Sequence, residues 1–116
     1  VLAEFLFEYS ERFILIEKIE KKIREKIKEK KIQLNLIINE LFDKPLPSDV
    51  NQLDFGQYTI VLSTKWEELG MNSLSKKEFF SRLDSVRKYR NALMHFKSCD
   101  HLSGTESCKS LLNLLI

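Results

Sequence analysis

The chain has 116 residues, of which 43% are hydrophobic and 31% charged, and its formal net charge is +2 at pH 7. This length fits one domain with its own core, so residues 1–116 are interpreted as a single domain. The charged fraction is typical of a globular protein. The near balance of acids and bases excludes a uniformly basic nucleic-acid-binding surface, so any RNA contact has to be local. Three glycines and two prolines leave little material for β-turns, which favours helices.

The first predicted helix runs from about Leu2 to Lys31, a stretch without Pro or Gly. Isoleucines recur in it at steps of three and four residues and form one apolar stripe, namely Ile16, Ile19, Ile23 and Ile27. Mixed charges surround the stripe and favour a solvated face over the alternative, a track for an RNA backbone. The chain starts at Val1 within this helical pattern, so we expect it to be a fragment of a longer protein.

The segment from Leu34 to Phe42 is more apolar, and it is expected to continue the helix or to start a second one after a bend. Asp43 to Asp49 contains two prolines and predicts a loop. Asp54 is a candidate N-cap for a short helix through Leu62, although Tyr58 to Val61 is β-branched enough for a strand. A lone strand would lack a partner, so the helix is preferred.

Three segments have the Ser/Thr-x-x-Glu form of a capping box, and each predicts a helix start. Thr64 to Glu67 predicts a helix of one or two turns that Gly70 ends, and Ser75 to Glu78 opens a helix that reaches His95 and Phe96. Ser103 to Glu106 opens a last helix through Leu115. The predicted fold is therefore all-α, a four- to five-helix bundle with a long first helix.

The helix that begins at Ser75 carries an apolar face at 100° per residue, formed by Phe79, Leu83, Val86, Leu93 and Met94. Arg90 falls inside this face, where a guanidinium is costly unless a carboxylate, a phosphate or an interface completes its hydrogen bonds. Asn91 and His95, four residues apart, share one edge of the helix, and Arg87 lies just inside that edge. The last carbonyls of the helix favour a protonated imidazole at His95.

Cleavage of RNA without a metal requires removal of the 2′-OH proton, protonation of the leaving oxygen and stabilisation of charge on phosphorus. Arg90, Asn91 and His95 supply groups of these kinds, with Arg87 as a candidate substrate-binding residue. The alternative is structural: a carboxylate of the chain pairs with Arg90, and His95 bonds to local backbone.

The segment from Arg90 to His95, an arginine followed by a polar residue and, after a short gap, a histidine, resembles the hallmark of the HEPN superfamily of helical domains. This resemblance implies an HEPN-like bundle and a metal-independent endoribonuclease or RNA-binding effector that needs no cofactor. It also implies a homodimer, in which two such motifs share one cleft. In that cleft Arg90 would hold the scissile phosphate, His95 would act as base or acid, and Asn91 would orient the imidazole or the substrate.

The resemblance extends loosely over Phe55 to Leu62, Trp66 to Gly70 and Phe79 to Phe96. These stretches look like a bacterial subgroup in which a segment like Leu2 to Ile27 follows a pair of CBS domains, which sense adenine nucleotides. A CBS-type domain is therefore an expected neighbour in the full-length chain. The alternative function is a catalytically silent HEPN module that dimerises and relays a signal between partner domains.

Two further classes of site are disfavoured by the sequence. His95, Cys99, His101 and Cys108 could suggest a metal cluster, but their spacing matches no familiar zinc pattern, so no metal is expected. No apolar run approaches the roughly 18 residues of a membrane span. Two cysteines without a disulfide framework or a secretory signal predict free thiols in a reducing cytoplasm.

Overall fold

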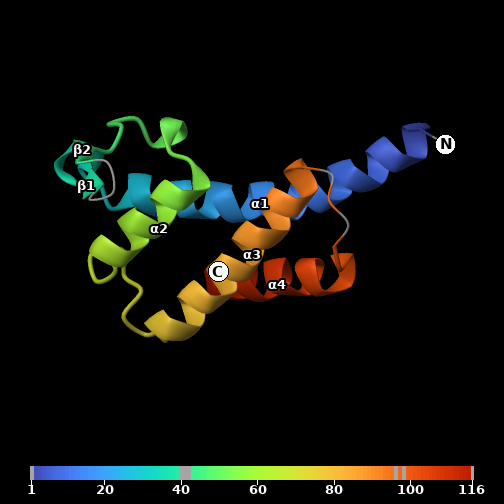
Figure 1. The fold of residues 1–116 in the computed structure, drawn as a ribbon. Coiled ribbons are helices and arrows are strands. Elements are labelled where there is room, and N and C mark those ends of the chain that lie inside the picture. The colour runs from blue at the N-terminus through green and yellow to red at the C-terminus, as the bar shows by residue number, and fades with distance from the viewer. Residues whose placement is uncertain (1, 40–42, 96, 98, 116) are drawn as a thin grey trace. The chain divides into compact units, whose positions relative to one another are not determined.

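The computed structural model describes residues 2–39, 43–95, 97 and 99–115, and this part of the chain is mostly helical (Figure 1). It contains four α-helices, namely α1 (Leu2–Glu29), α2 (Phe55–Thr64), α3 (Lys76–Met94) and α4 (His101–Leu115). The prediction of an all-α class is confirmed. None of the described helices is long and apolar enough to cross a membrane.

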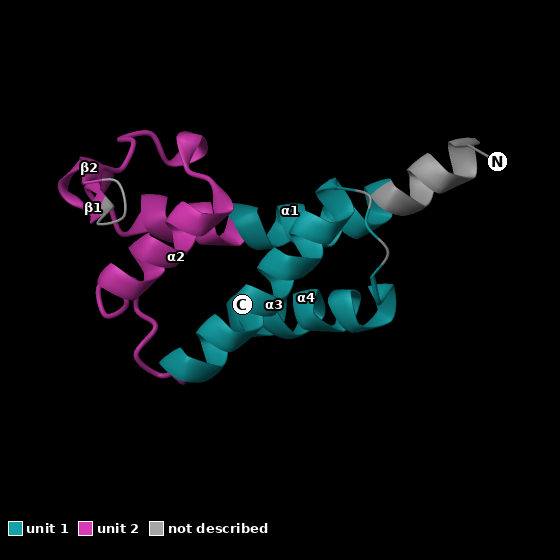
Figure 2. Cartoon of the chain, in the orientation of Figure 1, with its two compact units in different colours: residues 1–21, 76–116 teal, residues 22–75 magenta. Residues whose placement is uncertain are grey.

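The chain divides into two compact units, which Figure 2 distinguishes by colour. One unit consists of residues 1–21 and 76–116, and the other of residues 22–75. Helix α1 contributes to both units, because the boundary falls inside it. The assignment of residues 1–116 to a single domain stays a prediction.

The first unit is built around α3 and α4, which pack against each other. Phe79, Leu83, Val86 and Leu93 of α3 are buried as predicted. Met94 is not, since 50% of its surface is exposed. The reason is geometric: Tyr89 and Leu93, four residues apart, complete the buried stripe, and Met94 points about 140° away from Tyr89 on the helix.

Gly104 allows a close approach between α3 and α4. It is buried, and a Cβ atom placed on it would lie 2.3 Å from the Cδ1 atom of Tyr89. The aromatic ring therefore occupies the space that any other residue's side chain would need. Burial of Cys108, Leu111 and Leu115 completes the packed face of α4.

Helix α4 begins earlier than predicted, at His101 instead of after Ser103. The side chain of Asp100 accepts a hydrogen bond of 3.1 Å from the backbone N–H of Ser103, and its backbone oxygen accepts one from Gly104. Asp100 thus caps the helix, because a side-chain acceptor just before the first turn satisfies an N–H group that has no partner within the helix. Ser103 already lies in that turn. Helix α3 begins directly after Ser75, as predicted, and ends at Met94, while Phe96 lies outside the described residues.

The second unit starts with the last turns of α1, which ends at Glu29, two residues earlier than predicted. Lys31 adopts a φ of 53°, and the backbone N–H of Ile32 bonds to the oxygen of Ile27 while that of Lys31 bonds to Lys28. This is a left-handed helix end of the Schellman type.

The predicted isoleucine stripe is confirmed, since Ile16, Ile19, Ile23 and Ile27 are each at most 3% exposed.

The prediction of a helix from Leu34 is wrong for the residues that the structure describes. Leu34–Leu36 form a short 3-10 helix, and strand β1 (Ile38–Asn39) pairs antiparallel with strand β2 (Lys44–Pro45). Ile38 lies opposite Pro45, and Phe42 lies outside the described residues. Since Leu34 and Ile37 are buried while Leu36 and Ile38 are more than half exposed, the apolar residues do not share one helical face.

Helix α2 confirms the choice of helix over strand. Asp54 and Gln57 form a reciprocal capping box, in which each side chain accepts a hydrogen bond from the other residue's backbone N–H. Thr64 is not an N-cap, because it is the last residue of α2. The segment after it forms hydrogen-bonded turns that end at Gly70, whose φ of 74° suits glycine.

Candidate functional site

The predicted site residues lie at the C-terminal end of α3. Asn91 and His95 are both exposed, and the backbone N–H of His95 donates to the oxygen of Asn91 across the last turn. Because residues four apart on a helix are neighbours, these two positions share one edge of α3. His95 directly follows the helix, where the orphan carbonyls favour a positive charge.

Arg90 is met by a carboxylate. Its Nε atom lies 3.3 Å from an Oε atom of Glu20 on α1, and the two side chains are 27% and 17% exposed. This ion pair explains how a guanidinium is tolerated beside the apolar face of α3. The carboxylate partner that the structural alternative requires is therefore present in the fold.

Arg87 is held by a residue of its own helix. Its Nε and one terminal nitrogen donate to the same carboxylate oxygen of Asp84, at 3.1 and 2.8 Å. Hydrogen bonds from Arg87 and then from Lys88 lower the pKa of Asp84 below its ordinary value. Asp84 therefore stays negative at a lower pH than an ordinary aspartate does, and it competes with any phosphate for the Arg87 guanidinium.

A second polar cluster, centred on His101, lies in the same unit and was not predicted. Arg12 of α1 lies 3.3 Å from Nε2 of His101, and the hydroxyl of the buried Tyr89 lies 3.2 Å from Nδ1. A guanidinium can only donate, so a neutral His101 accepts at Nε2 and donates from Nδ1 to the tyrosine oxygen. The Tyr89 and His101 rings also meet edge to face, with centroids 5.8 Å apart.

The His101 cluster joins residues that are 12 and 89 positions apart in the sequence. No local spacing could therefore reveal it. In the sequence, His101 drew attention only together with Cys99, as part of a metal site that the spacing disfavours.

Two of the four residues that were considered as a metal cluster, Cys99 and His101, lie close together. Cys99 lies 3.7 and 3.9 Å from the two nitrogens of His101, but Cys108 is fully buried and His95 is exposed. Within the described ranges, no group of three or more His, Cys, Asp and Glu side chains could hold a metal ion.

The two cysteines are expected to differ in reactivity. Burial raises the pKa of the Cys108 thiol from 9.0 to about 11, whereas Cys99 is only half-buried. Because the thiolate is the reactive form, Cys108 of the folded chain should react with a thiol reagent at pH 8 at least about a hundredfold more slowly than in urea. The variant Cys99→Ser leaves Cys108 as the only cysteine of the chain, so the labelling rate of Cys108 can be measured alone. Two rapidly labelled thiols in the native chain would contradict the burial of Cys108.

Comparisons with known proteins do not extend this description: no family model, no curated protein and no solved structure matches the chain. The HEPN resemblance therefore rests on the segment from Arg90 to His95 and on the looser similarity of the stretches around it.

Proposed function

We propose that this chain is an HEPN-type metal-independent endoribonuclease or RNA-binding effector of the cytoplasm, with Arg90 and His95 in a cleft completed by a second copy. The observation that carries the proposal is the placement of an exposed His95 and an exposed Asn91 on one edge of α3, at the same helix end as Arg90. An exposed imidazole can exchange protons with a substrate, and a guanidinium can hold a phosphate.

One copy of the chain supplies too few groups for the reaction. Attack by the 2′-OH needs a base, an acid and a cation, whereas one α3 offers a single histidine at its end. A two-fold axis beside this helix end would bring two copies of His95 and Arg90 into one cleft. The half-exposed Met94 supports such an interface, because methionine is enriched at protein–protein contacts and Met94 directly precedes His95.

The proposal is tested by incubating the chain with single-stranded RNA in the presence of EDTA. Attack by the 2′-OH is expected to leave 2′,3′-cyclic phosphate ends, and an RNA methylated at every 2′-OH should stay intact because its nucleophile is blocked. Mass spectrometry of the products distinguishes these ends from the 5′-phosphate and 3′-hydroxyl ends of hydrolysis. A dimeric, folded protein that neither binds nor cleaves RNA between pH 5 and 8 would refute the nuclease proposal.

A second candidate is a catalytically silent HEPN module that dimerises and relays a signal, for example from a CBS-type domain in the full-length chain. The ion pair between Arg90 and Glu20 favours it, because it already compensates the guanidinium charge without RNA. Both candidates require association. Sedimentation at tens of micromolar is expected to show a homodimer, and a single species of 13.7 kDa would count against both.

A further inference from the structure

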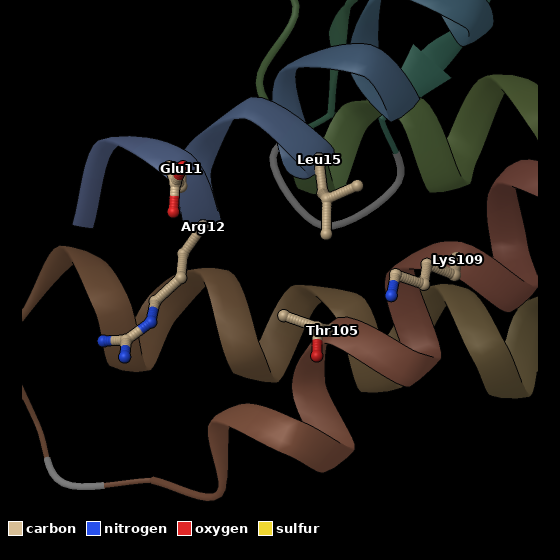
Figure 3. Close-up of a pocket in the computed structure, with 5 residues that line it drawn as sticks. All are labelled: Glu11, Arg12, Leu15, Thr105 and Lys109. Atoms are coloured by element: carbon tan, nitrogen blue, oxygen red, sulfur yellow. The ribbon is translucent and has the colours of Figure 1, made fainter. Parts of the chain in front are cut away.

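A pocket of about 260 Å³ lies between α1 and α4, and none of the residues assigned to RNA lines it. Glu11, Arg12 and Leu15 of α1 line it together with Thr105 and Lys109 of α4. Figure 3 shows Leu15 and Thr105 in the middle, with Arg12 on one side and Lys109 on the other. The pocket thus has an apolar centre between two charged ends.

The centre is apolar because the polar atom of Thr105 is used within its own helix. Its hydroxyl donates to the backbone oxygens of His101 and Leu102, at 2.9 and 3.0 Å. The threonine methyl group and Leu15 are therefore left to contact the aliphatic part of a ligand.

One end of the pocket is lined by both a carboxylate and a guanidinium. Glu11 and Arg12 are consecutive, and Arg12 is positioned by its 3.3 Å contact with His101, which Tyr89 holds in turn. Neighbouring carboxylate and guanidinium groups complement an ammonium and a carboxylate, the two groups of a zwitterionic amino-acid head. An ammonium group on the ligand can pair with Glu11, which an anion without such a group cannot do.

The other end of the pocket carries the Lys109 ammonium. Neither Lys109 nor Glu11 forms an ion pair with another residue of the described ranges. Arg12 contacts α4 at His101, and Lys109 lies eight residues further on, which is about 12 Å along the helix axis. The flexible Lys109 side chain is long enough to reach toward the centre, so a second anionic group a few bonds from the head can meet it.

We propose that this pocket binds a small zwitterion with a second anionic group, that is, a ligand of the acidic amino-acid class. The volume supports a ligand of this size, because pockets for drug-sized molecules and nucleotides start at about 300 Å³. The site does not depend on the function proposed for the end of α3, and it adds a small-molecule ligand to a chain otherwise expected to bind RNA.

The test is a titration of the 15N-labelled chain with L-glutamate at constant ionic strength, followed by NMR. Saturable shifts of the amides of Leu15, Thr105 and Lys109 are expected, with a dissociation constant of the order of 1 mM because the ion pairs are open to solvent. Glutarate lacks the ammonium group and L-norvaline lacks the second carboxylate. Each is expected to bind at least about threefold more weakly than L-glutamate.

Substitutions assign the binding to this pocket. Lys109→Met and Glu11→Gln should each weaken L-glutamate binding at least about threefold, whereas the exposed Lys97 lies outside the pocket and Lys97→Met should leave it unchanged. Shifts that do not saturate by about 50 mM, equal binding of glutarate, or unchanged binding by a folded Lys109→Met variant would each overturn the proposal.

Discussion

Replacing His95 with alanine is expected to lower the rate of RNA cleavage at least about a hundredfold while the fold stays intact. The imidazole is the only histidine side chain in the segment from Arg90 to His95, and histidine is the residue that most often transfers protons in catalysis. Its removal therefore eliminates proton transfer to or from the RNA. Because His95 is exposed, its side chain adds little packing, and the free energy of unfolding should change by less than about 0.5 kcal/mol.

Single-turnover cleavage of a defined RNA measures this effect, and urea unfolding verifies the fold. Lys77→Ala is the matched control, because Lys77 is an exposed residue of the same helix near its opposite end. If His95→Ala cleaves RNA as fast as the unchanged chain, this histidine is not the acid or base.

Arg90 needs a different design, because its substitution by alanine also breaks the ion pair with Glu20. Glu20→Gln removes the charge of the partner and keeps Arg90. If Arg90 acts on the phosphate, Glu20→Gln should retain cleavage and Arg90→Ala should lose it. Equal losses in both variants would assign the ion pair a structural role alone.

Replacing Ile23 with alanine is expected to cost about 2–5 kcal/mol of unfolding free energy. Ile23 is fully buried in the apolar stripe of α1, so the shortened side chain loses its packing and leaves a cavity. Lys22→Ala is the control from the adjacent position. Lys22 makes one exposed ion pair with Glu25, at 3.8 Å, and its loss should cost less than about 0.5 kcal/mol.

Urea unfolding of the two variants measures the difference directly. A cost below about 1 kcal/mol for Ile23→Ala would mean that this part of α1 does not pack as described.

The helices that could be predicted are those whose signals are local. Asp54 marks the start of α2 because its cap needs only Gln57, three residues on, and the isoleucine stripe follows from the period of the helix itself. The capping pattern at Thr64 misled for a local reason too: the residues before it were already helical, so no helix could start there. A capping box marks a start only where the preceding backbone is extended.

What could not be predicted depends on partners distant in sequence. The strand at Ile38 exists because Pro45 lies opposite it, and nothing in an apolar run of this length distinguishes a strand from a buried helix. The partner of Arg90 is Glu20, 70 positions earlier and one of many acidic residues of α1. The segment from Arg90 to His95 therefore placed the candidate site at a helix end. The charged residues that surround the site could be identified only from the fold.

The contact between Gly104 and Tyr89 permits only one register of α4 on α3. A shift of α4 by one residue would bring the Cβ atom of Ser103 or Thr105 to the position where the tyrosine ring now lies, and a Cβ atom there would overlap it. The same tyrosine holds His101, the first residue of α4, and His101 holds Arg12. Sliding of α4 along α3 therefore requires the Tyr89 ring to move, and that movement disturbs the contacts of His101 and Arg12 as well.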